Sequence, residues 1–147
     1  MSVNGGVYIA ANTTAEIITA TAALFPITWT ALGNRHGDAS ITETGATGKL
    51  TCPPGRYFVS FTASVDVDDS TTSISFQLYK DASAVTGMKC TNYSVASGRP
   101  ASVSFQGFVD VASSDTGALQ VYVVHNGLGT ATITITEAQF VALAVDG

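Results

Sequence analysis

The chain has 147 residues, enough for one domain with a real core, and its 46% of hydrophobic against 12% of charged residues argues against a disordered polymer. Its net charge is −5, and no two of its six lysines and arginines are adjacent. Because neutralising phosphates requires clustered positive charge, this distribution argues against binding nucleic acid or an anionic membrane.

Threonine, valine, isoleucine and aromatic residues dominate, and clusters of glycine, asparagine, aspartate and serine interrupt them at short intervals. This pattern is typical of an antiparallel all-β sandwich or jelly roll. We expect an N-terminal arm at residues 1–6 and a single domain at residues 7–147. In chain order, the expected strands are residues 7–10, 17–29 with a break at Pro26, 39–42, 49–52, 56–67, 73–80, 89–95, 101–111, 119–125 and 132–145.

The stretch 56–67 alternates between apolar and polar residues, as a strand with one buried face does. One face carries six residues that we assign to the core, namely Tyr57, Val59, Phe61, Ala63, Val65 and Val67. The opposite face is polar except for Phe58. That phenylalanine therefore needs a cover other than the core of its own domain.

The end of the last strand, residues 140–145, is apolar on both faces. A sheet with one wet face alternates, so a strand that does not alternate must be covered twice. We assign the face that begins with Phe140 to the core, and Val141 and Leu143 to a face that needs a second cover. A partner subunit would cover these two residues together with Phe58; a loop of the same chain is the alternative.

The segment 47–61, which reads Thr-Gly-Lys-Leu-Thr-Cys-Pro-Pro-Gly-Arg-Tyr-Phe-Val-Ser-Phe, resembles the hallmark stretch of the C1q/tumour-necrosis-factor superfamily. In that stretch a strand runs into a Pro-Gly turn and an aromatic strand follows. Pro54 and Gly55 suit a tight turn, because proline fixes φ and glycine adopts conformations that other residues resist. Residues 140–145 are similar to the family's closing strand, and residues 105–123 to its strand, acidic-glycine turn and strand.

The resemblance implies a jelly roll of about ten antiparallel strands that forms a homotrimer around a threefold axis. Phe58 would lie near that axis, and Val141 and Leu143 would face a neighbouring copy. Ser60 and Gln139 are their polar neighbours, so the centre of the trimer would be partly hydrogen-bonded. These five residues are the expected trimer interface.

Catalytic chemistry has little support, and we expect no enzyme, no cofactor and no metal site. The two histidines, His36 and His125, have no nucleophile elbow or metal-ligand spacing around them. Asp66, Asp68 and Asp69 form an acidic cluster that we interpret as a solvated turn. A Ca²⁺ site is the alternative, because oxygen-rich loops can hold this ion.

Two further features leave alternatives open. Cys52 and Cys90 are expected to be reduced thiols, although they could pair if their strands are neighbours. Trp29, Tyr93 and Tyr122 could line a sugar site, but Tyr122 lies in an expected strand and is assigned to packing in the core or at an interface.

The sequence begins without a secretory signal and contains no apolar run of about 20 residues. Secreted ligands of this superfamily need a signal or anchor, and its spore-surface members usually carry a collagen-like stalk. We therefore expect a non-catalytic virion structural protein, a phage capsid decoration (cement) protein. It would assemble in the host cytoplasm and bind the major capsid protein at the capsid surface. The alternatives are a receptor- or glycan-binding knob of a head fibre or tail spike, and a stand-alone trimeric ligand.

Overall fold

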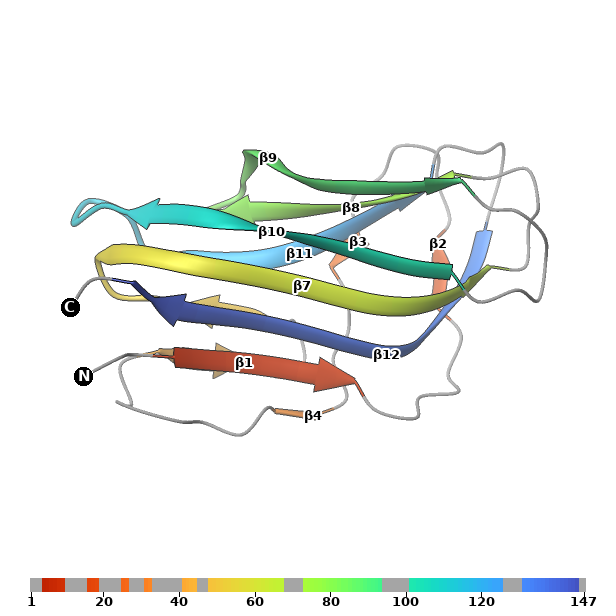
Figure 1. The fold of residues 1–147 in the computed structure, drawn as a ribbon, viewed down its shortest axis with the longest axis horizontal. Coiled ribbons are helices and arrows are strands. Elements are labelled where there is room, and N and C mark those ends of the chain that lie inside the picture. Colours follow the sequence, from red (N-terminus) through yellow and green to blue (C-terminus); the bar gives the residue numbers. More distant parts are fainter. Residues whose placement is uncertain are drawn as a thin grey trace.

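Two antiparallel sheets that pack face to face make up the protein, described here by a computed structural model (Figure 1). The structure describes residues 4–9, 16–18, 25–26, 31–32, 41–44, 48–67, 73–93, 101–125 and 131–145. In these ranges there are twelve strands and no helix. The strands are β1 (Asn4–Ile9), β2 (Glu16–Ile18), β3 (Phe25–Pro26), β4 (Ala31–Leu32), β5 (Thr42–Thr44), β6 (Lys49–Thr51), β7 (Gly55–Val67), β8 (Ser73–Lys80), β9 (Ser83–Tyr93), β10 (Ala101–Val111), β11 (Ala118–His125) and β12 (Ala131–Ala144).

The first sheet has the strand order β10-β7-β12-β1-β4, and β2 pairs with the beginning of β12. Its neighbours are far apart in the sequence, as jelly-roll connections require. The register between β12 and β7 shifts between Ile135 and Glu137, and the Thr136 hydroxyl there donates a 3.2 Å hydrogen bond to the Ser64 carbonyl. Such a bulge bends its strand, and Figure 1 shows β12 turning towards β2 near its start.

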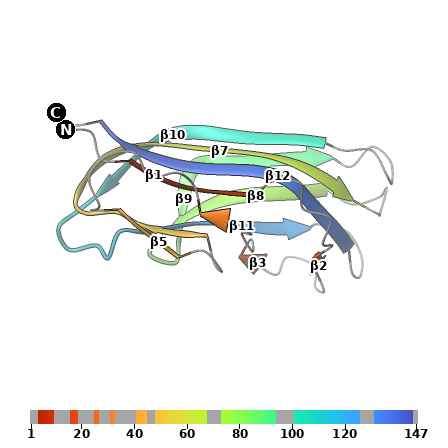
Figure 2. The ribbon, with the colours of Figure 1, turned by 90° about the horizontal axis from the view of Figure 1, so that it is seen from below.

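The second sheet has the order β5-β6-β11-β8-β9, and β3 pairs with β11. It lies across from the first sheet, as Figure 2 shows. Pro26 lies in the two-residue strand β3, opposite Tyr122. Proline has no backbone N–H to donate to a neighbouring strand. Its presence is therefore consistent with a short strand and not with a long central one.

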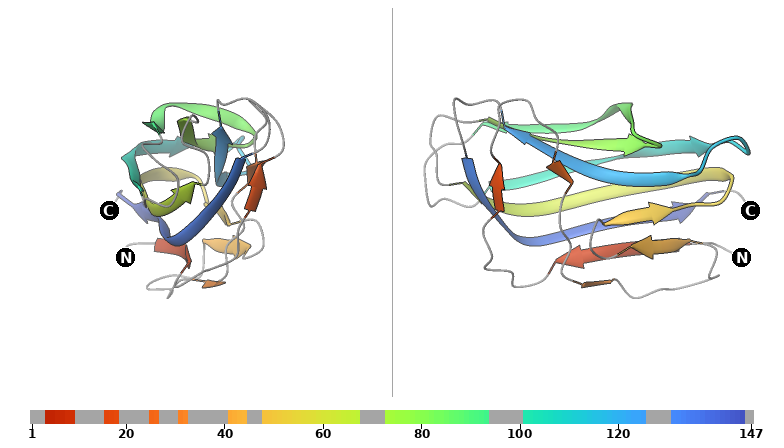
Figure 3. Two further views of the ribbon diagram at one scale, coloured as in Figure 1. Left: turned by 90° about the vertical axis from the view of Figure 1, so that its right-hand side faces the viewer. Right: turned by 180° about the vertical axis from the view of Figure 1, so that it is seen from behind.

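The core lies between the two sheets, which Figure 3 shows end-on and from behind. Tyr57, Val59, Phe61, Ala63 and Val65 of β7 are all buried, as predicted, while the Val67 side chain lies outside the described residues. Aromatic packing joins the layers. The Phe61 ring lies 5.3 Å from that of Phe76 in β8 and 5.1 Å from that of Phe105 in β10, measured between ring centroids.

The chain enters β7 through the predicted Pro-Gly turn. Gly55 has a φ of +155°, which L side chains rarely adopt. The Tyr57 hydroxyl donates a 2.7 Å hydrogen bond to the Pro53 carbonyl, which ties the turn to the buried ring that follows it. Tyr57 and Phe61 therefore lie in the core, as the residues of this segment predict.

Most long strands lie where the sequence places them. β8 and β10 have the predicted bounds, β7 and β11 begin one residue earlier than predicted, and β12 begins and ends one residue earlier. The prediction was wrong for β9, which begins at Ser83 and not at residue 89. The connection before it is a two-residue hairpin, Asp81 and Ala82, with φ values of 48° and 65°. Two-residue hairpin turns usually contain glycine. Because this turn has none, the sequence lacks the usual indication that β9 begins directly after it.

The N-terminal third is only partly described. β1 begins at Asn4 and pairs with β12, so residues 4–6 of the expected arm belong to the sheet; residues 1–3 lie outside the described residues. The expected strand 17–29 contributes only the short strands β2 and β3 to the described part. The prediction of a strand at 39–42 was wrong in its described part, because Ile41 precedes the strand β5, which spans Thr42–Thr44; residues 39–40 lie outside the described residues. The division into an arm and one domain stays a prediction.

Candidate functional site

The five expected interface residues lie together on the outer face of the first sheet. Phe58 is paired with Leu143, and Ser60 with Val141, across β7 and β12. Their chain neighbours Val59 and Ala142 are fully buried, so the five point the other way. Leu143 is 39% exposed, Gln139 is also exposed, and Phe58, Ser60 and Val141 are half-buried.

The sequence analysis missed Phe108, which extends this apolar row onto β10. Phe108 is paired with Phe58, and it is 56% exposed. Val145, 47% exposed, follows at the end of β12. A signal was present in the sequence: Phe108 occupies the same face as the polar residues Ser104 and Gln106 and breaks their series. We call Phe58, Phe108, Val141, Leu143 and Val145 the apolar row.

Arg56 lies against the Phe108 end of the apolar row. Its guanidinium carbon is 5.1 Å from the centroid of the Phe108 ring, and its Nε is 3.5 Å from Oδ1 of Asp110. A cation over an exposed aromatic face contributes about 0.5–1 kcal/mol, and an exposed ion pair contributes little. This arginine therefore leaves the neighbouring apolar surface open to a partner.

Polarity rises along the same face, away from the apolar row. The cross-strand set next to Phe108, Phe58 and Leu143 contains Gln106 and Ser60 beside Val141 of the apolar row, and the set after it is entirely polar, with Ser104, Thr62 and Gln139. The face thus offers an apolar end and a hydrogen-bonding middle. Among the described residues, no three His, Cys, Asp or Glu side chains gather as metal ligands. What this face offers is contact with another surface.

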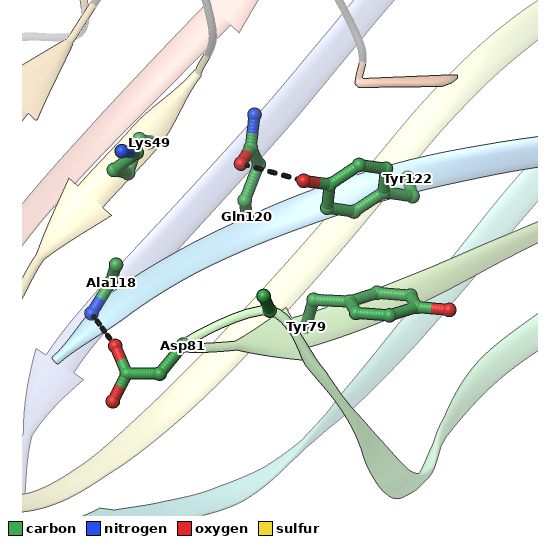
Figure 4. Close-up of a pocket in the computed structure, with 7 residues that line it drawn as sticks. Lys49, Tyr79, Asp81, Ala118, Gln120 and Tyr122 are labelled. Carbon is green, nitrogen blue, oxygen red and sulfur yellow. Dashed lines mark hydrogen bonds between the residues drawn. The ribbon is translucent and has the colours of Figure 1, made fainter. Parts of the chain in front are cut away.

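A shallow cavity of about 270 Å³ lies on the outer face of the second sheet, on the other side of the sandwich. Its lining residues are Lys49, Tyr79, Asp81, Ala82, Ala118, Gln120 and Tyr122. Figure 4 shows Lys49 and Asp81 on one side of the space and the two tyrosine rings on the other. The rings meet edge to face with centroids 4.7 Å apart, and the Tyr122 hydroxyl donates to Gln120 Oε1 at 3.2 Å. Tyr122 is therefore half-buried beside a cavity and not in the core.

The cavity borders a well-anchored corner formed by the β8–β9 and β10–β11 turns. The carboxylate of Asp81 accepts hydrogen bonds from the Thr116 hydroxyl and from the Ala118 amide at 2.9 Å. Lys80 donates to Asp115 at 2.7 Å, and the Ala112 amide donates to the same carboxylate at 2.9 Å.

These contacts lower the pKa of both aspartates. The hydrogen bond from Thr116 is the largest cause for Asp81, and the hydrogen bond from Lys80 is the largest for Asp115. Both groups therefore carry negative charge more readily than an ordinary aspartate. At neutral pH, Asp81 therefore lines the cavity as an ionised carboxylate.

Several other sequence candidates are only partly placed. Asp66 is half-buried, and its Oδ1 has no hydrogen-bond partner among the described residues. Its expected companions Asp68 and Asp69 lie outside the described residues, as do His36 and Trp29. The side chains of His125 and Tyr93 are not described either.

The two cysteines are free thiols. Cys52 is buried at the end of β6, and burial raises its pKa to about 12. Cys90 is half-buried in the edge strand β9. The strands β6 and β9 are separated by β11 and β8, so the condition for pairing, neighbouring strands, is not fulfilled, and only Cys52 is fully buried. The described residues also contain no helix long and apolar enough to cross a bilayer.

Comparison with known proteins defines the fold. No protein-family model matches the sequence, and a comparison with curated protein sequences finds no match. Among solved structures, murine APRIL is 14% identical, with a TM-score of 0.62 over 99% of this chain and 100% of that one. The globular domain of zebrafish complement 1qA is 16% identical, with a TM-score of 0.58 over 98% of both chains. The PRD1 vertex protein P5 is 13% identical, with a TM-score of 0.60 over 98% of this chain and 97% of that one.

Identities this low establish the fold alone. The chain is an all-β domain with the jelly-roll fold of the TNF and C1q proteins, as the sequence predicts. Within that fold, Phe108, Leu143 and Val145 of the apolar row are large hydrophobic side chains exposed on the first sheet.

Proposed function

We propose that the chain is a non-catalytic homotrimeric virion protein that binds and reinforces a phage capsid. The observation that carries the proposal is the apolar row. Phe108, Leu143 and Val145 are all the large hydrophobic side chains that are exposed among the described residues, and they lie at one end of one sheet. Contiguous exposed apolar surface of this kind marks an interaction site.

Copies of the same chain are the proposed cover for the apolar row. The resemblance in residues 47–61 implies a threefold trimer, and the five residues it places at the interface occupy one face of the sheet. Closed symmetry buries the same face of every copy and leaves none exposed. The polar middle of the face, with Ser60 and Gln139, would supply hydrogen bonds between subunits.

The capsid partner is supported by the fold shared with a phage vertex protein, PRD1 P5. A trimer offers three equal contacts to the major capsid protein. Linked contacts multiply avidity, so that a modest contact per subunit suffices to hold a shell together. Assembly in the host cytoplasm would place the trimer on the capsid surface.

Multi-angle light scattering of the purified chain, followed by co-sedimentation with undecorated capsids of the same phage, tests both parts of the proposal. We expect a trimer that sediments with capsids and raises their resistance to heat. A monomer contradicts the trimer, and a trimer that stays in the supernatant contradicts the decoration role. In the latter case, binding of the trimer to host cells would favour the receptor-binding knob of a head fibre or tail spike.

A further inference from the structure

The cavity on the second sheet is lined by a polar group that has no polar partner among the described residues. The Lys49 ammonium makes no hydrogen bond or ion pair with any described residue. The Tyr79 ring also lines the space, but its hydroxyl points away from Lys49 and Gln120 (Figure 4). Both side chains are half-buried. A polar group that lines a concave space without a described partner is available to bind a ligand.

The three central side chains of the cavity come from neighbouring strands at one level of the sheet. Tyr79 in β8 is paired with Gln120 in β11. Leu119 is paired with Leu50 of β6, so Lys49 faces Gln120 on the next step of the ladder. Rigid strands therefore fix the spacing of the ammonium, the amide and the aromatic ring. Sites on strands hold their geometry better than sites on loops.

The charges in the cavity balance. Lys49 contributes one positive charge, and Asp81 one negative charge that the surrounding hydrogen bonds hold in place. A strongly charged ligand would be repelled by one of the two walls. A neutral ligand with hydroxyl groups could accept a hydrogen bond from Lys49 and donate one to the oxygen of Tyr122, whose hydroxyl points towards Gln120 (Figure 4).

The tyrosine pair favours a ligand with an apolar face as well. Tyr79 and Tyr122 meet edge to face, and such rings combine a large apolar surface with a polar tip. A sugar ring has this dual character, because its C–H groups lie on one side and its hydroxyls point outward. The volume of about 270 Å³ is at or below the low end of ligand pockets, which fits one ring and not a long oligosaccharide.

We infer that this cavity binds one neutral sugar residue, either free or at the end of a glycan. The site does not depend on capsid binding. It lies on the sheet opposite the apolar row, so a trimer closed through that row leaves the cavity accessible. The anchored corner at Asp81 keeps one wall in place before the ligand arrives, which lowers the entropy cost of binding.

Saturation-transfer difference NMR on the purified chain tests the inference with five free sugars. D-glucose, D-galactose, D-mannose and N-acetyl-D-glucosamine are the neutral probes, and N-acetylneuraminic acid is the acidic one. We expect saturation transfer to at least one neutral sugar and none to the acidic sugar. No transfer to any neutral sugar overturns the inference, and so does transfer to the acidic sugar, with or without transfer to a neutral one.

Two conservative variants locate the binding. Lys49→Met and Tyr122→Phe each remove one hydrogen-bonding group that lines the space and keep the bulk of the side chain. Each should weaken binding about tenfold with an unchanged melting temperature. Lys89→Met, an exposed lysine on β9 that does not line the cavity, is the matched control and should bind as the native chain does. Equal binding by all three variants would place the sugar elsewhere and overturn the inference. Capsids are absent from this assay, so its outcome is separate from that of the decoration proposal.

Discussion

The ring of Phe58 meets the ring of Phe108 edge to face, with centroids 5.6 Å apart and an interplanar angle of 65°. The two residues are directly opposed on β7 and β10, and both rings point away from the domain core. Aromatic pairs in this arrangement contribute about 0.5–1.5 kcal/mol beyond their buried area. The pair holds Phe108 in place while leaving more than half of it exposed, so a partner meets an ordered surface.

Charging the apolar row should prevent trimer formation. Phe58→Asp, Phe108→Asp or Leu143→Asp would place one carboxylate per subunit in the proposed interface, at a cost of several kcal/mol each. We expect soluble monomer or aggregate in light scattering at a concentration where the native chain is trimeric. Thr86→Asp, on an exposed site of β9 in the other sheet, should remain trimeric. If both Phe58→Asp and Leu143→Asp also remain trimeric, the interface assignment is wrong.

Local alternation made much of this face predictable. Phe58 stands among polar residues in a strand whose other face is apolar, and Leu143 lies in a strand without alternation. Phe108 was not predicted to lie on this face. Its neighbour Gly107 occupies an inward position of β10 without an apolar side chain, so the alternation of apolar and polar residues is interrupted there. A Cβ at Gly107 would lie 2.6 Å from the Met88 sulfur, so a side chain of β9 occupies the space that a residue of β10 would normally fill.

The cavity could not be predicted in the same way. Lys49, Tyr79 and Gln120 come from three strands, and their proximity depends on the register between β6, β11 and β8. Register is a property of the whole sheet, since each strand's pairing is fixed by its buried face and by its turns. The sequence singled out Tyr122 as a possible sugar contact but gave no partner for it.

Acid should destabilise the corner that anchors the β8–β9 and β10–β11 turns. The pKa of Asp115 is lower in the folded chain than its ordinary value of 3.8, chiefly because of the hydrogen bond from Lys80. A lowered folded pKa gives stability that is present above the ordinary value and is lost as the pH falls through the folded value. Urea titrations between pH 6 and pH 2 should therefore show a falling free energy of unfolding below about pH 4.

The variant Asp115→Asn isolates that contribution. It cannot titrate, so it should be less stable than the native chain at pH 6, and the difference should shrink towards pH 2. Asp81→Asn should behave alike, because hydrogen bonds from Thr116 and the backbone lower the pKa of Asp81. A constant difference between native and variant chains at every pH would mean that the carboxylate charge contributes nothing.

Thiol labelling should distinguish the two cysteines. Burial raises the pKa of Cys52 to about 12, so almost no thiolate forms at pH 8 and reagent has no access to it. Cys90 is half-buried on an edge strand and should react first. Mass spectrometry after exposure to a maleimide should find one label per native chain and two per chain in denaturant. Rapid double labelling of the native chain would show that the end of β6 opens locally.

Gly117 should be one of the least replaceable residues of the corner. Its φ is +72°, and a Cβ there would lie 2.0 Å from the carbonyl oxygen of Cys52, whose amide donates to the Gly117 carbonyl at 2.9 Å. Gly117→Ala must therefore adopt an unfavourable φ and also displace the backbone of Cys52.

Gly87 provides the matched control, because its φ is +81° and nothing lies within 4 Å of a Cβ built there. Gly87→Ala should cost about 1 kcal/mol from the backbone conformation alone, whereas Gly117→Ala should cost about 3 kcal/mol or more. Urea unfolding of the three chains at one protein concentration measures the difference, and equal costs would show that β6 can move aside.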